Sequence, residues 1–471
     1  MPGQMKIENE SDQITVDLFV LGGGPGGYFA AGLAGQEGLN VVLAEKNKIG
    51  GVCLNEGCIP SKSLLHSAKI CSHSKDALEY GITGAPLVLD QKAVIKRKNK
   101  IVNTLVQGVK MQMRQGHVTV LEDEARVVGR ANGRIHLSVS DQLYTTTNLI
   151  IATGSIPIIP PIQGIDDGIA KGYLLTNREA LDLQVIPQRL VVIGGGAIGL
   201  EMASYYHSAG SDVIVIEMLD HIGGAIDRTI AALLQRSLEE KGIQFALGAK
   251  AMEIHEDRVI YEQNGETFTT QSDFVLLSVG RRPSIENNGF ETIQLYTDKG
   301  RIVTDRQCRT NIPGVYAIGD VNGRCMLAHV AYREAHVAVN TILSRRDTMR
   351  YDAVPSVIYT QPEVASVGMT EEEAKLKGIA YKKISIPLQY SGRFMAETAG
   401  ESSLCQMLFS ADQKYLIGCH LLGPYTSEFI TIASVFIEKE MTVDEMKEII
   451  FPHPTVSEVL REAIFQLRAI N

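Results

Sequence analysis

The first part of the chain alternates between short apolar runs and glycine-rich turns. Residues 14–21 are apolar and rich in β-branched side chains, and they lead directly into the turn GGGPGG. An alanine-rich segment of helical character follows to about residue 37, and a second apolar run at 40–44 ends on Glu45. This order of strand, glycine-rich turn, helix, strand and acidic residue predicts the βαβ unit that binds dinucleotides.

The same pattern recurs from residue 189. An apolar run leads into GGGAIG, a helical segment extends to about residue 209, and a strand at 212–216 ends on Glu217. Gly194 precedes Glu217 by the same interval as Gly22 precedes Glu45. Because chance matches rarely reproduce both spacings, the two copies predict two dinucleotide sites in one chain.

The remaining periodicity predicts further helices and strands. A helix capped by Asp90 should reach about residue 115, and Asn132-Gly133 should form the turn of a hairpin. Other predicted helices lie at 61–74, 222–241 and 327–344, and other predicted strands at 118–121, 125–128, 134–139 and 149–151. From about residue 350 the glycine-rich turns stop, which indicates a separate C-terminal domain.

Composition restricts the function classes. The chain has 471 residues, a formal net charge of −9 and 45% hydrophobic residues, which is ordinary for a globular protein and argues against a general binder of nucleic acid or acidic membranes. No apolar run approaches the length of a membrane span, and the polar N-terminal stretch lacks a signal core. Seven cysteines in so long a chain fit a reducing compartment, so we expect a cytoplasmic location.

The stretch GGVCLNEGCIPSK at 50–62 carries the most unusual chemistry. Two cysteines, Cys53 and Cys58, are separated by four residues and followed by Pro60 at the start of a helix. On a regular helix their Cα atoms would lie roughly 9 Å apart, whereas a disulfide tolerates less than about 7 Å. A bridge would therefore require a distorted turn, which Gly57 permits, and it would be easily reduced. Two cysteines packed as small apolar side chains remain the alternative at this point.

The glycine-rich turns have distinct expected roles. In the first, Gly22 makes the tight turn, Gly24 lets the backbone approach a pyrophosphate, and Gly27 lets helix and strand pack closely. Glu45 should accept hydrogen bonds from a ribose. In the second, the carboxylate of Glu217 would repel a 2′-phosphate, which favours NAD(H) over NADP(H).

Three other features allow two interpretations each. Asp320 follows a buried strand and could be only a turn residue. His453 and Glu458 could be an acid–base pair, but Thr455 with Glu458 also spells a helix capping box. The basic residues of the helix at 91–115 suggest a solvated face, with a docking patch for an acidic partner as the alternative.

From about Thr15 onward, these motifs resemble the flavoprotein disulfide reductases, and CLNEGCIPSK is similar to the redox motif of their dihydrolipoyl dehydrogenase branch. Ile198 stands where NADPH-using glutathione reductases usually have a tyrosine. The resemblance implies an α/β fold with two Rossmann-like dinucleotide-binding domains and a C-terminal α+β dimerisation domain. The expected segments are a first FAD-binding part at 1–156, an NAD-binding domain at 157–279, a second FAD part at 280–349 and an interface domain at 350–471.

The resemblance also implies which residues contact each cofactor. The expected FAD contacts are Gly22, Gly24, Gly27, Glu45, Gly51, Lys62, Ala125, Thr153, Gly154, Ser155, Asp320, Met326, Leu327, Ala328 and His329. The expected NAD contacts are Gly194, Gly196, Ala197, Ile198, Gly199, Glu201, Glu217 and Gly280. Lys62 should pair with Glu201 beside the flavin, and no metal site is expected.

The implied activity is the oxidation of protein-bound dihydrolipoamide to lipoamide through a Cys53–Cys58 redox disulfide, FAD and NAD. His453 would be the acid–base residue, oriented by Glu458, and both would come from the partner subunit of a homodimer. We expect the lipoyl group to arrive on the carrier domain of a 2-oxoacid dehydrogenase or glycine cleavage complex. The alternatives are a reductase of another disulfide in the same superfamily, a flavin-dependent electron carrier, and a structural subunit with vestigial sites.

Several positions depart from the family pattern. Phe451-Pro452 precedes His453 where His-Ala is frequent, Ala335 replaces a glycine, and Ala125 stands where a flavin-contacting glycine is common. The segment 391–394 is an altered form of the family's Asn-x-Arg-Ala. None of these changes removes a reacting group, so we expect them to affect partner choice and substrate access.

Overall fold

The computed structural model describes residues 13–398 and 400–467, which form two compact units. Unit 1 contains the chain up to Pro60, Asn99–Ile158 and Arg281–Arg350. Unit 2 contains Ser61–Lys98, Ile159–Gly280 and the chain from Tyr351 onward. Helices α3 (Cys58–Lys75) and α4 (Gln91–Gln115) run across the unit boundaries.

Unit 1 is organised around a seven-stranded sheet in the order β3–β2–β1–β6–β5–β4, with β19 also paired to β6. The strands are β1 (Gln13–Leu21), β2 (Val41–Ala44), β3 (Thr119–Leu121), β4 (Ala125–Ala131), β5 (Arg134–Val139), β6 (Gln142–Ile151) and β19 (Val315–Ala317). The pairs involving β1, β2, β3 and β19 are parallel, whereas β4–β5–β6 is antiparallel. Because β19 pairs with β6, which in turn pairs with β1, the late segment of the chain lies near the first glycine-rich turn.

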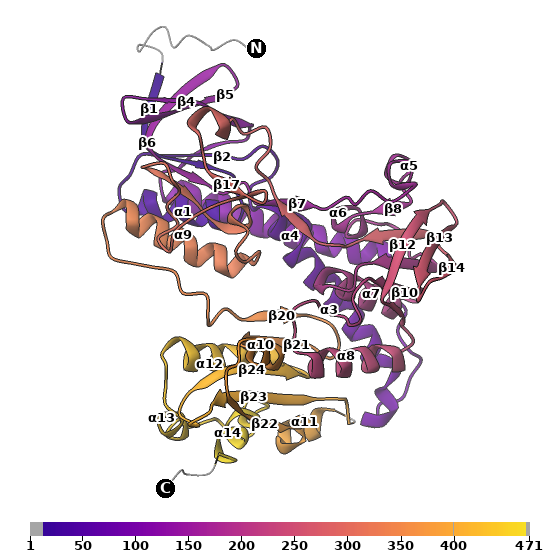
Figure 1. Ribbon diagram of the computed structural model, residues 1–471. Helices are drawn as coiled ribbons and strands as arrows, with labels where there is room; N and C mark the ends of the chain where they lie inside the picture. Colours follow the sequence, from indigo (N-terminus) through magenta and orange to yellow (C-terminus); the bar gives the residue numbers. More distant parts are fainter. Residues whose placement is uncertain (1–12, 399, 468–471) are drawn as a thin grey trace. The chain divides into compact units, whose positions relative to one another are not determined.

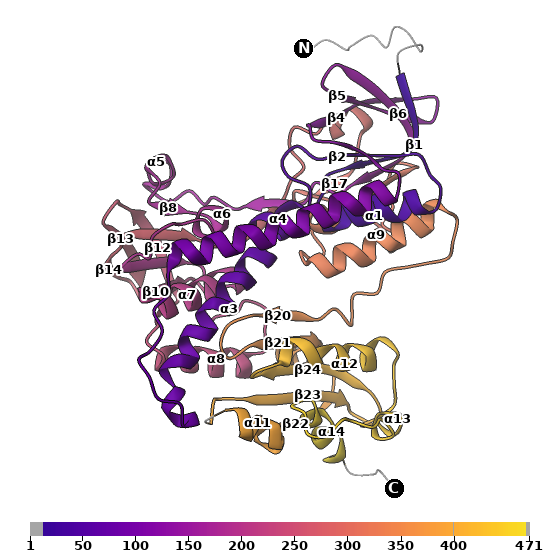
Figure 2. The ribbon, with the colours of Figure 1, turned by 180° about the vertical axis from the view of Figure 1, so that it is seen from behind.

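Helices α1 (Pro25–Gln36) and α9 (Ala328–Ile342) pack side by side in unit 1, as Figures 1 and 2 show from opposite sides. Small residues permit this approach: a Cβ on Gly26 would lie 3.3 Å from the Cβ of Ala331. The short helix α2 (Gly51–Glu56) also packs against α1. Two small pairings complete the unit: β7 (Ser155–Pro157) with β16 (Arg281–Pro283), and β17 (Thr297–Asp298) with β18 (Arg301–Ile302).

Unit 2 contains a parallel sheet in the order β11–β10–β9–β15–β8. Its strands are β8 (Leu174–Leu175), β9 (Arg189–Ile193), β10 (Asp212–Glu217), β11 (Gln244–Leu247) and β15 (Phe274–Leu277). The helices of this part are α5 (Ile165–Lys171), α6 (Asn177–Ala180), α7 (Ala197–Ala209) and α8 (Arg228–Glu240), and β12 (Ala249–Ile254), β13 (Arg258–Gln263) and β14 (Glu266–Gln271) form a separate antiparallel sheet.

The C-terminal part of unit 2 is an antiparallel sheet in the order β20–β21–β24–β23–β22. Its strands are β20 (Ser356–Ile358), β21 (Val364–Gly368), β22 (Tyr381–Ile386), β23 (Leu404–Ser410) and β24 (Leu416–Leu422). Its helices are α10 (Glu371–Leu376), α11 (Gly392–Glu397), α12 (Thr426–Glu438), α13 (Val443–Lys447) and α14 (Glu458–Phe465).

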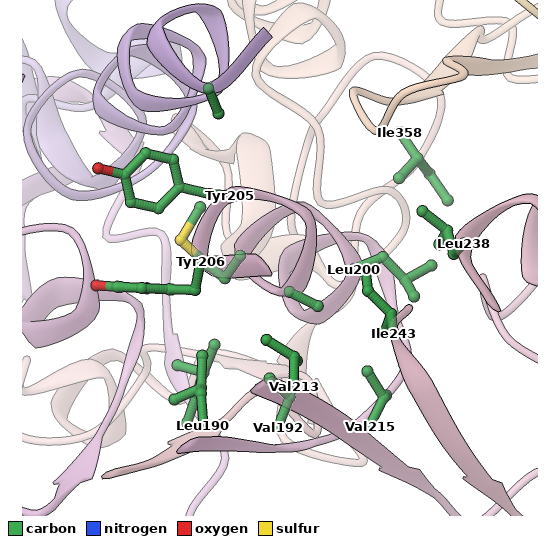
Figure 3. Close-up of a cluster of buried hydrophobic side chains, with 14 of the residues drawn as sticks. Leu190, Val192, Leu200, Tyr205, Tyr206, Val213, Val215, Leu238, Ile243 and Ile358 are labelled. Carbon is green, nitrogen blue, oxygen red and sulfur yellow. The ribbon is translucent and has the colours of Figure 1, made fainter. Parts of the chain in front are cut away.

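Figure 3 shows part of the hydrophobic core of unit 2. Tyr205 and Tyr206 on α7 lie above Leu190 and Val192 of β9, and all four side chains are fully or almost fully buried. The phenols are not left unpaired, because the hydroxyl of Tyr205 donates to Gln91 and that of Tyr206 to a backbone carbonyl, each at 2.5 Å. This core therefore ties α7 to the parallel sheet and to the start of α4.

Most predicted elements are present, with differences at several boundaries. The hairpin turn at Asn132-Gly133 is confirmed by positive φ at both residues. The predicted helix from residue 222 begins only at Arg228, because Gly223 and Gly224 adopt positive φ and Asp227 caps the helix. In addition, α3 begins at Cys58, before residue 61, and β4 continues to Ala131, beyond residue 128. Strand β6 begins at Gln142, well before the predicted start at residue 149.

Candidate functional site

The first glycine-rich turn joins β1 to α1 in unit 1. A Cβ on Gly27 would lie 1.8 Å from the carbonyl oxygen of Gly22, so only glycine fits where the helix passes the strand. Gly24 caps α1 without a side-chain hydrogen bond, which leaves the N-terminal N–H groups directed outward for an anion. The carboxylate of Glu45, which is buried, accepts the N–H of Gly23 at 2.7 Å. This arrangement fits the adenosine diphosphate part of a dinucleotide.

The second glycine-rich turn, in unit 2, repeats this geometry. A Cβ on Gly199 would lie 2.0 Å from the carbonyl oxygen of Gly194, while one on Gly196 would meet nothing within 4 Å. Glu217 accepts the N–H of Gly195 at 2.6 Å. Ala197, Ile198 and Glu201 lie on α7 directly after the turn, and Gly280 follows β15, the neighbour of β9. The open backbone at Gly196 and the anchored carboxylate fit a second dinucleotide without a 2′-phosphate.

Lys62 and Glu201 form the predicted ion pair in unit 2. The Nζ of Lys62 lies 2.9 and 2.8 Å from the two carboxylate oxygens, and Glu201 is 6% exposed. The sequence did not point to Tyr359, yet its backbone N–H donates to Glu201 at 3.1 Å and its ring lies 4.2 Å below Nζ. The pair is thus fixed by a third residue from the C-terminal part of the chain.

The two cysteines lie in unit 1 on either side of a break between helices. Cys53 is on α2 and half-buried, while Cys58 is the first residue of α3 and exposed. Gly57 separates the helices with φ −149° and ψ −109°, and a Cβ there would lie 3.1 Å from the carbonyl oxygen of Val52. A distorted turn of the kind that a bridge between Cys53 and Cys58 would require is therefore present at Gly57.

Helix α2 begins directly against the first glycine-rich turn. A Cβ on Gly51, which has φ +60°, would lie 2.6 Å from the Cα of Gly24. This contact explains why the motif opens with glycine and shows that the cysteine stretch and the first glycine-rich turn, where the sequence predicts a pyrophosphate, are neighbours within unit 1.

A third group of predicted residues converges at the carboxyl ends of β6 and β19. Ser155 donates to the carboxylate of Asp320 at 2.5 Å, and Arg281 donates to the Ser155 hydroxyl at 2.8 Å. Burial raises the pKa of Asp320, although Ser155 and Arg281 oppose this shift. Asp320 is therefore more than a turn residue: it is a desolvated carboxyl within a polar network.

Neighbouring predicted residues support this network. Thr153 donates to the carbonyl of Ser284 at 2.7 Å, and the carbonyl of Gly154 accepts the N–H of the same residue at 2.9 Å. The segment from Met326 to His329 begins α9, whose N-cap Leu327 makes no side-chain hydrogen bond. Ala328 opens that helix, and the N–H of Val330 in its first turn donates to the carbonyl of Leu327 at 3.1 Å.

Glu334 is a residue of this region that the sequence analysis missed. It is fully buried, accepts the N–H of Gly319 at 2.6 Å and the side-chain amide of Asn322 at 2.9 Å, and so holds the turn that carries Asp320. Its position one residue before the unusual Ala335 was the only signal available. Ala125, in contrast, starts β4, pairs with Val139 and is buried in the sheet core.

His453 and Glu458 contact each other in unit 2. The Nδ1 of His453 lies 2.9 and 3.1 Å from the carboxylate oxygens, and Glu458 is 4% exposed. Burial raises the pKa of Glu458, but the Thr455 N–H, His453 and Arg461 outweigh it and lower the pKa overall. Glu458 also accepts the Thr455 N–H at 2.8 Å, but α14 begins at Glu458 with Ser457 as its N-cap and no side-chain capping hydrogen bond, so the predicted capping box is not formed. The carboxylate can hold Nδ1–H and leave Nε2 to take up a proton.

Two further findings concern what the described residues do not contain. Within residues 13–398 and 400–467, no helix is both long and apolar enough to cross a membrane. The same residues contain no cluster of three or more histidine, cysteine or acidic side chains that could hold a metal ion.

Comparisons with known proteins place the chain in a family. Residues 16–335 match the family model "Pyridine nucleotide-disulphide oxidoreductase", and residues 354–464 match its dimerisation domain. A curated dihydrolipoyl dehydrogenase from Geobacillus stearothermophilus is 37% identical over 96% of this chain and 96% of its own, and one from Mycoplasma pneumoniae is 34% identical over 95% and 98%.

Solved structures agree with this assignment. The crystal structure of LpdA from Mycobacterium tuberculosis has a TM-score of 0.87, 25% sequence identity, and coverage of 96% of this chain and 100% of that one. The flavoprotein disulfide reductase RclA from Escherichia coli shares the fold, with a TM-score of 0.84 at 24% identity, over 96% of this chain and 100% of its own. The chain therefore belongs to the pyridine nucleotide-disulphide oxidoreductase family, as an oxidoreductase with FAD and NAD(H) as cofactors and with the family's dimerisation domain.

Proposed function

We propose that the protein is a dihydrolipoyl dehydrogenase, which oxidises protein-bound dihydrolipoamide to lipoamide with NAD⁺ as the final acceptor. The observation that carries this proposal is the similarity to curated dihydrolipoyl dehydrogenases over at least 95% of this chain and of theirs. Cys53 and Cys58 beside the distorted turn, and His453 in contact with Glu458, would supply the reacting groups that this activity needs.

The dithiol half of the reaction needs a base and an electrophilic sulfur. His453 would accept a proton from one substrate thiol at Nε2, and Glu458 would stabilise the resulting imidazolium. The substrate thiolate would attack Cys53, forming a mixed disulfide and releasing Cys58 as a thiolate. The second substrate thiol would then displace Cys53 and complete the lipoamide disulfide.

The proposed cofactor positions follow from the two glycine-rich turns. Gly22, Gly24, Gly27 and Glu45 would hold the adenosine half of FAD, while Asp320 and Ser155 would hold its central part. Gly194 to Gly199 and Glu217 would hold NAD. When bound, FAD supplies the two-electron relay between the dithiol and NAD⁺. Lys62, fixed by Glu201, would place a positive charge beside the flavin ring.

We further propose that the site is shared between two subunits. The His453 side chain is 76% exposed, although its carboxylate partner is 5% exposed, so the ring is oriented but open to another molecule. A match to the family's dimerisation domain over residues 354–464 supports a second copy as that molecule. The segments 1–156 and 280–349 would then bind FAD, 157–279 NAD, and 350–471 the partner.

The substrate would arrive on a lipoylated carrier domain of a 2-oxoacid dehydrogenase or glycine cleavage complex. The cysteine usage of the sequence supports a cytoplasmic setting, where a working disulfide is redox-active.

The decisive experiment measures NAD⁺-dependent oxidation of dihydrolipoamide by the purified flavin-containing protein, with glutathione disulfide and coenzyme A disulfide tested in parallel as oxidised substrates with NADH. We expect dihydrolipoamide turnover to exceed the other two activities by at least about a hundredfold, a gap of about 3 kcal/mol in transition-state binding. Preferential reduction of another disulfide would overturn the proposal in favour of a different reductase of the same family.

A further inference from the structure

Two tyrosines of unit 1 form a hydroxyl pair that the reaction described above does not use. Tyr28 lies on the first turn of α1 and Tyr332 on α9, and their hydroxyl groups are hydrogen-bonded to each other. Their rings meet edge to face with centroids 6.0 Å apart, and Phe29 packs against Tyr332 at 5.4 Å. Because α1 and α9 lie side by side (Figure 2), this pair is fixed by helix packing.

The pair lies next to the cysteine stretch. The N–H of Tyr28 donates to the carbonyl of Gly24 at 2.9 Å, so Tyr28 is one helical turn beyond that glycine. A Cβ on Gly51, two residues before Cys53, would lie 2.6 Å from the Cα of Gly24. The hydroxyl pair and the start of α2 thus occupy one corner of unit 1.

Electrostatics agree with this proximity. Burial raises the pKa of both phenols. The hydrogen bond between them raises the pKa of Tyr28 further and lowers that of Tyr332, and the charges of Cys53 and Cys58 raise both to a smaller extent. Both phenols therefore remain protonated at neutral pH.

The number of hydroxyl protons determines how many hydrogen bonds the tyrosine pair can donate. Two hydroxyl groups carry two protons, and the bond between them uses only one. The other proton remains available to an acceptor beside the pair. A thiolate is such an acceptor, and hydrogen bonds to charged groups are roughly twice as strong as those between neutral groups.

We propose that Tyr28 and Tyr332 act together as a positioning pair that stabilises the reduced, thiolate form of the Cys53–Cys58 couple. This inference rests on the proposed function, because it assumes that these cysteines cycle between disulfide and dithiol. It assigns a role to two residues that lie outside the cysteine, histidine and glycine motifs described above.

The redox step balances without an electron from either tyrosine. A dithiol such as dithiothreitol gives two electrons to the Cys53–Cys58 disulfide and becomes a cyclic disulfide. The products on the protein are one thiol and one thiolate, and one proton is released. A hydrogen bond from the tyrosine pair lowers the free energy of the thiolate, so it shifts the equilibrium toward the reduced state.

The test compares full-length holoenzymes carrying Tyr28→Phe, Tyr332→Phe, both changes, or Tyr144→Phe as a control. Tyr144 is a buried tyrosine of the same unit that packs against Phe19. Each protein is equilibrated at one pH in graded dithiothreitol buffers and alkylated, and the modified Cys53 and Cys58 are counted by mass spectrometry. Every variant keeps Glu56, the carboxylate of α2, so a difference between variants cannot arise from that charge.

We expect the double variant to shift the equilibrium about tenfold toward the disulfide, equivalent to about 30 mV for a two-electron couple. Each single variant should show part of this shift, and Tyr144→Phe none. A double variant within about twofold of wild type, by the same scale, would overturn the inference. Should the double variant fail to fold, Tyr332→Phe alone decides, because an unshifted equilibrium there leaves the pair without a role.

The same titration separates the two proposals. Failure of the wild-type cysteines to titrate together as a two-electron couple would refute the proposed function itself. A normal wild-type couple that is indifferent to loss of both hydroxyl groups would refute only the tyrosine inference. A slower alkylation of the reduced double variant at neutral pH provides an independent readout, since the thiolate is the reacting form.

Discussion

One carboxylate, that of Glu458, sets the orientation of the His453 ring. Glu458 is almost fully buried, binds Nδ1 with both oxygens and is itself held by the Thr455 N–H. A carboxylate with a lowered pKa stays ionised, so it fixes the tautomer in which Nε2 can accept a proton. The sequence allows either a helix cap or a contact with His453, and the geometry shows the contact, whereas α14 has Ser457 as its N-cap without a side-chain capping bond.

The expected consequence is a selective defect in the variant His453→Gln. Because only the dithiol half of the reaction requires a thiol base, dihydrolipoamide oxidation should fall by about 10²–10⁴-fold. NADH-dependent reduction of ferricyanide, which bypasses the cysteines, should stay within about twofold of wild type by the same reasoning. Parallel steady-state assays of both activities provide the measurement.

Equal losses in the two assays would contradict the assignment of His453 as the thiol base. Cys53→Ser is the matched control, because it should also remove dithiol oxidation while leaving the ferricyanide activity.

The residue contacts that the sequence did not indicate have one physical cause in common. Tyr28 and Tyr332 are separated by 304 positions, and Tyr359 by 158 from Glu201. No local pattern marks such pairs, because each residue alone is compatible with ordinary packing. Only the packing of α1 against α9, and of α7 near β20, brings them together.

Among secondary-structure elements, α8 shows why a boundary can be misplaced. The apolar periodicity starts at residue 222, but the positive φ of Gly223 and Gly224 excludes a helix there. Asp227 then caps α8 by accepting the Thr229 N–H at 2.9 Å, and it also accepts the side-chain amide of Gln406 on β23 at 2.8 Å. A tertiary contact thus reinforces the true start of the helix.

Strand β24 contains a buried histidine with a predictable effect on stability. His420 is fully buried, its Nε2 lies 2.9 Å from the carbonyl of Met369, and burial lowers its pKa, with partial opposition from Met369, Asp227 and the α10 carboxylates Glu372 and Glu373. The folded ring therefore stays neutral at a pH where the unfolded ring, with a pKa of about 6.5, takes up a proton. The unfolded state binds more protons below that pH, so the free energy of unfolding should decrease as pH falls.

The test compares wild type with His420→Gln in urea unfolding at pH 7.5 and pH 5.5. Wild type should lose more stability than the variant, by at most about 1.4 kcal/mol per pH unit below 6.5. His73→Gln, at an exposed position on α3, is the control and should retain the wild-type difference. Identical pH dependence in wild type and His420→Gln would show that this ring does not contribute.

At the scale of the whole molecule, the dimerisation domain raises the question of whether one active site is built from two subunits. If His453 serves the cysteines of a second copy, then mixed dimers of His453→Gln and Cys53→Ser contain one site with both intact groups. Random exchange makes half of the dimers mixed, and each has one of two sites intact, so about a quarter of wild-type activity should return.

Subunit exchange under mild denaturant, followed by the dihydrolipoamide assay, measures this recovery. Each parent variant treated alone should stay inactive. An inactive mixture in which mass spectrometry detects mixed dimers would refute the shared site while leaving the reaction chemistry unaffected.

The sequence by itself determined the two βαβ units, the residues of their turns and the family of the protein. These features are local: glycine is required where backbone meets backbone, and a fixed number of residues separates the turn from the acid at the end of the next strand. The position of the break between α2 and α3 is local too, because Gly57 between Cys53 and Cys58 permits the backbone conformation found there.

Tertiary structure alone decided which distant groups share an environment. It placed Asp320 in a polar network with Ser155 and Arg281, fixed that turn through the buried Glu334, and brought Tyr28 and Tyr332 into contact beside the cysteine stretch. The physical reason is that burial and hydrogen bonding between distant segments depend on how helices and sheets pack, and a one-dimensional pattern records only which residues are available for that packing.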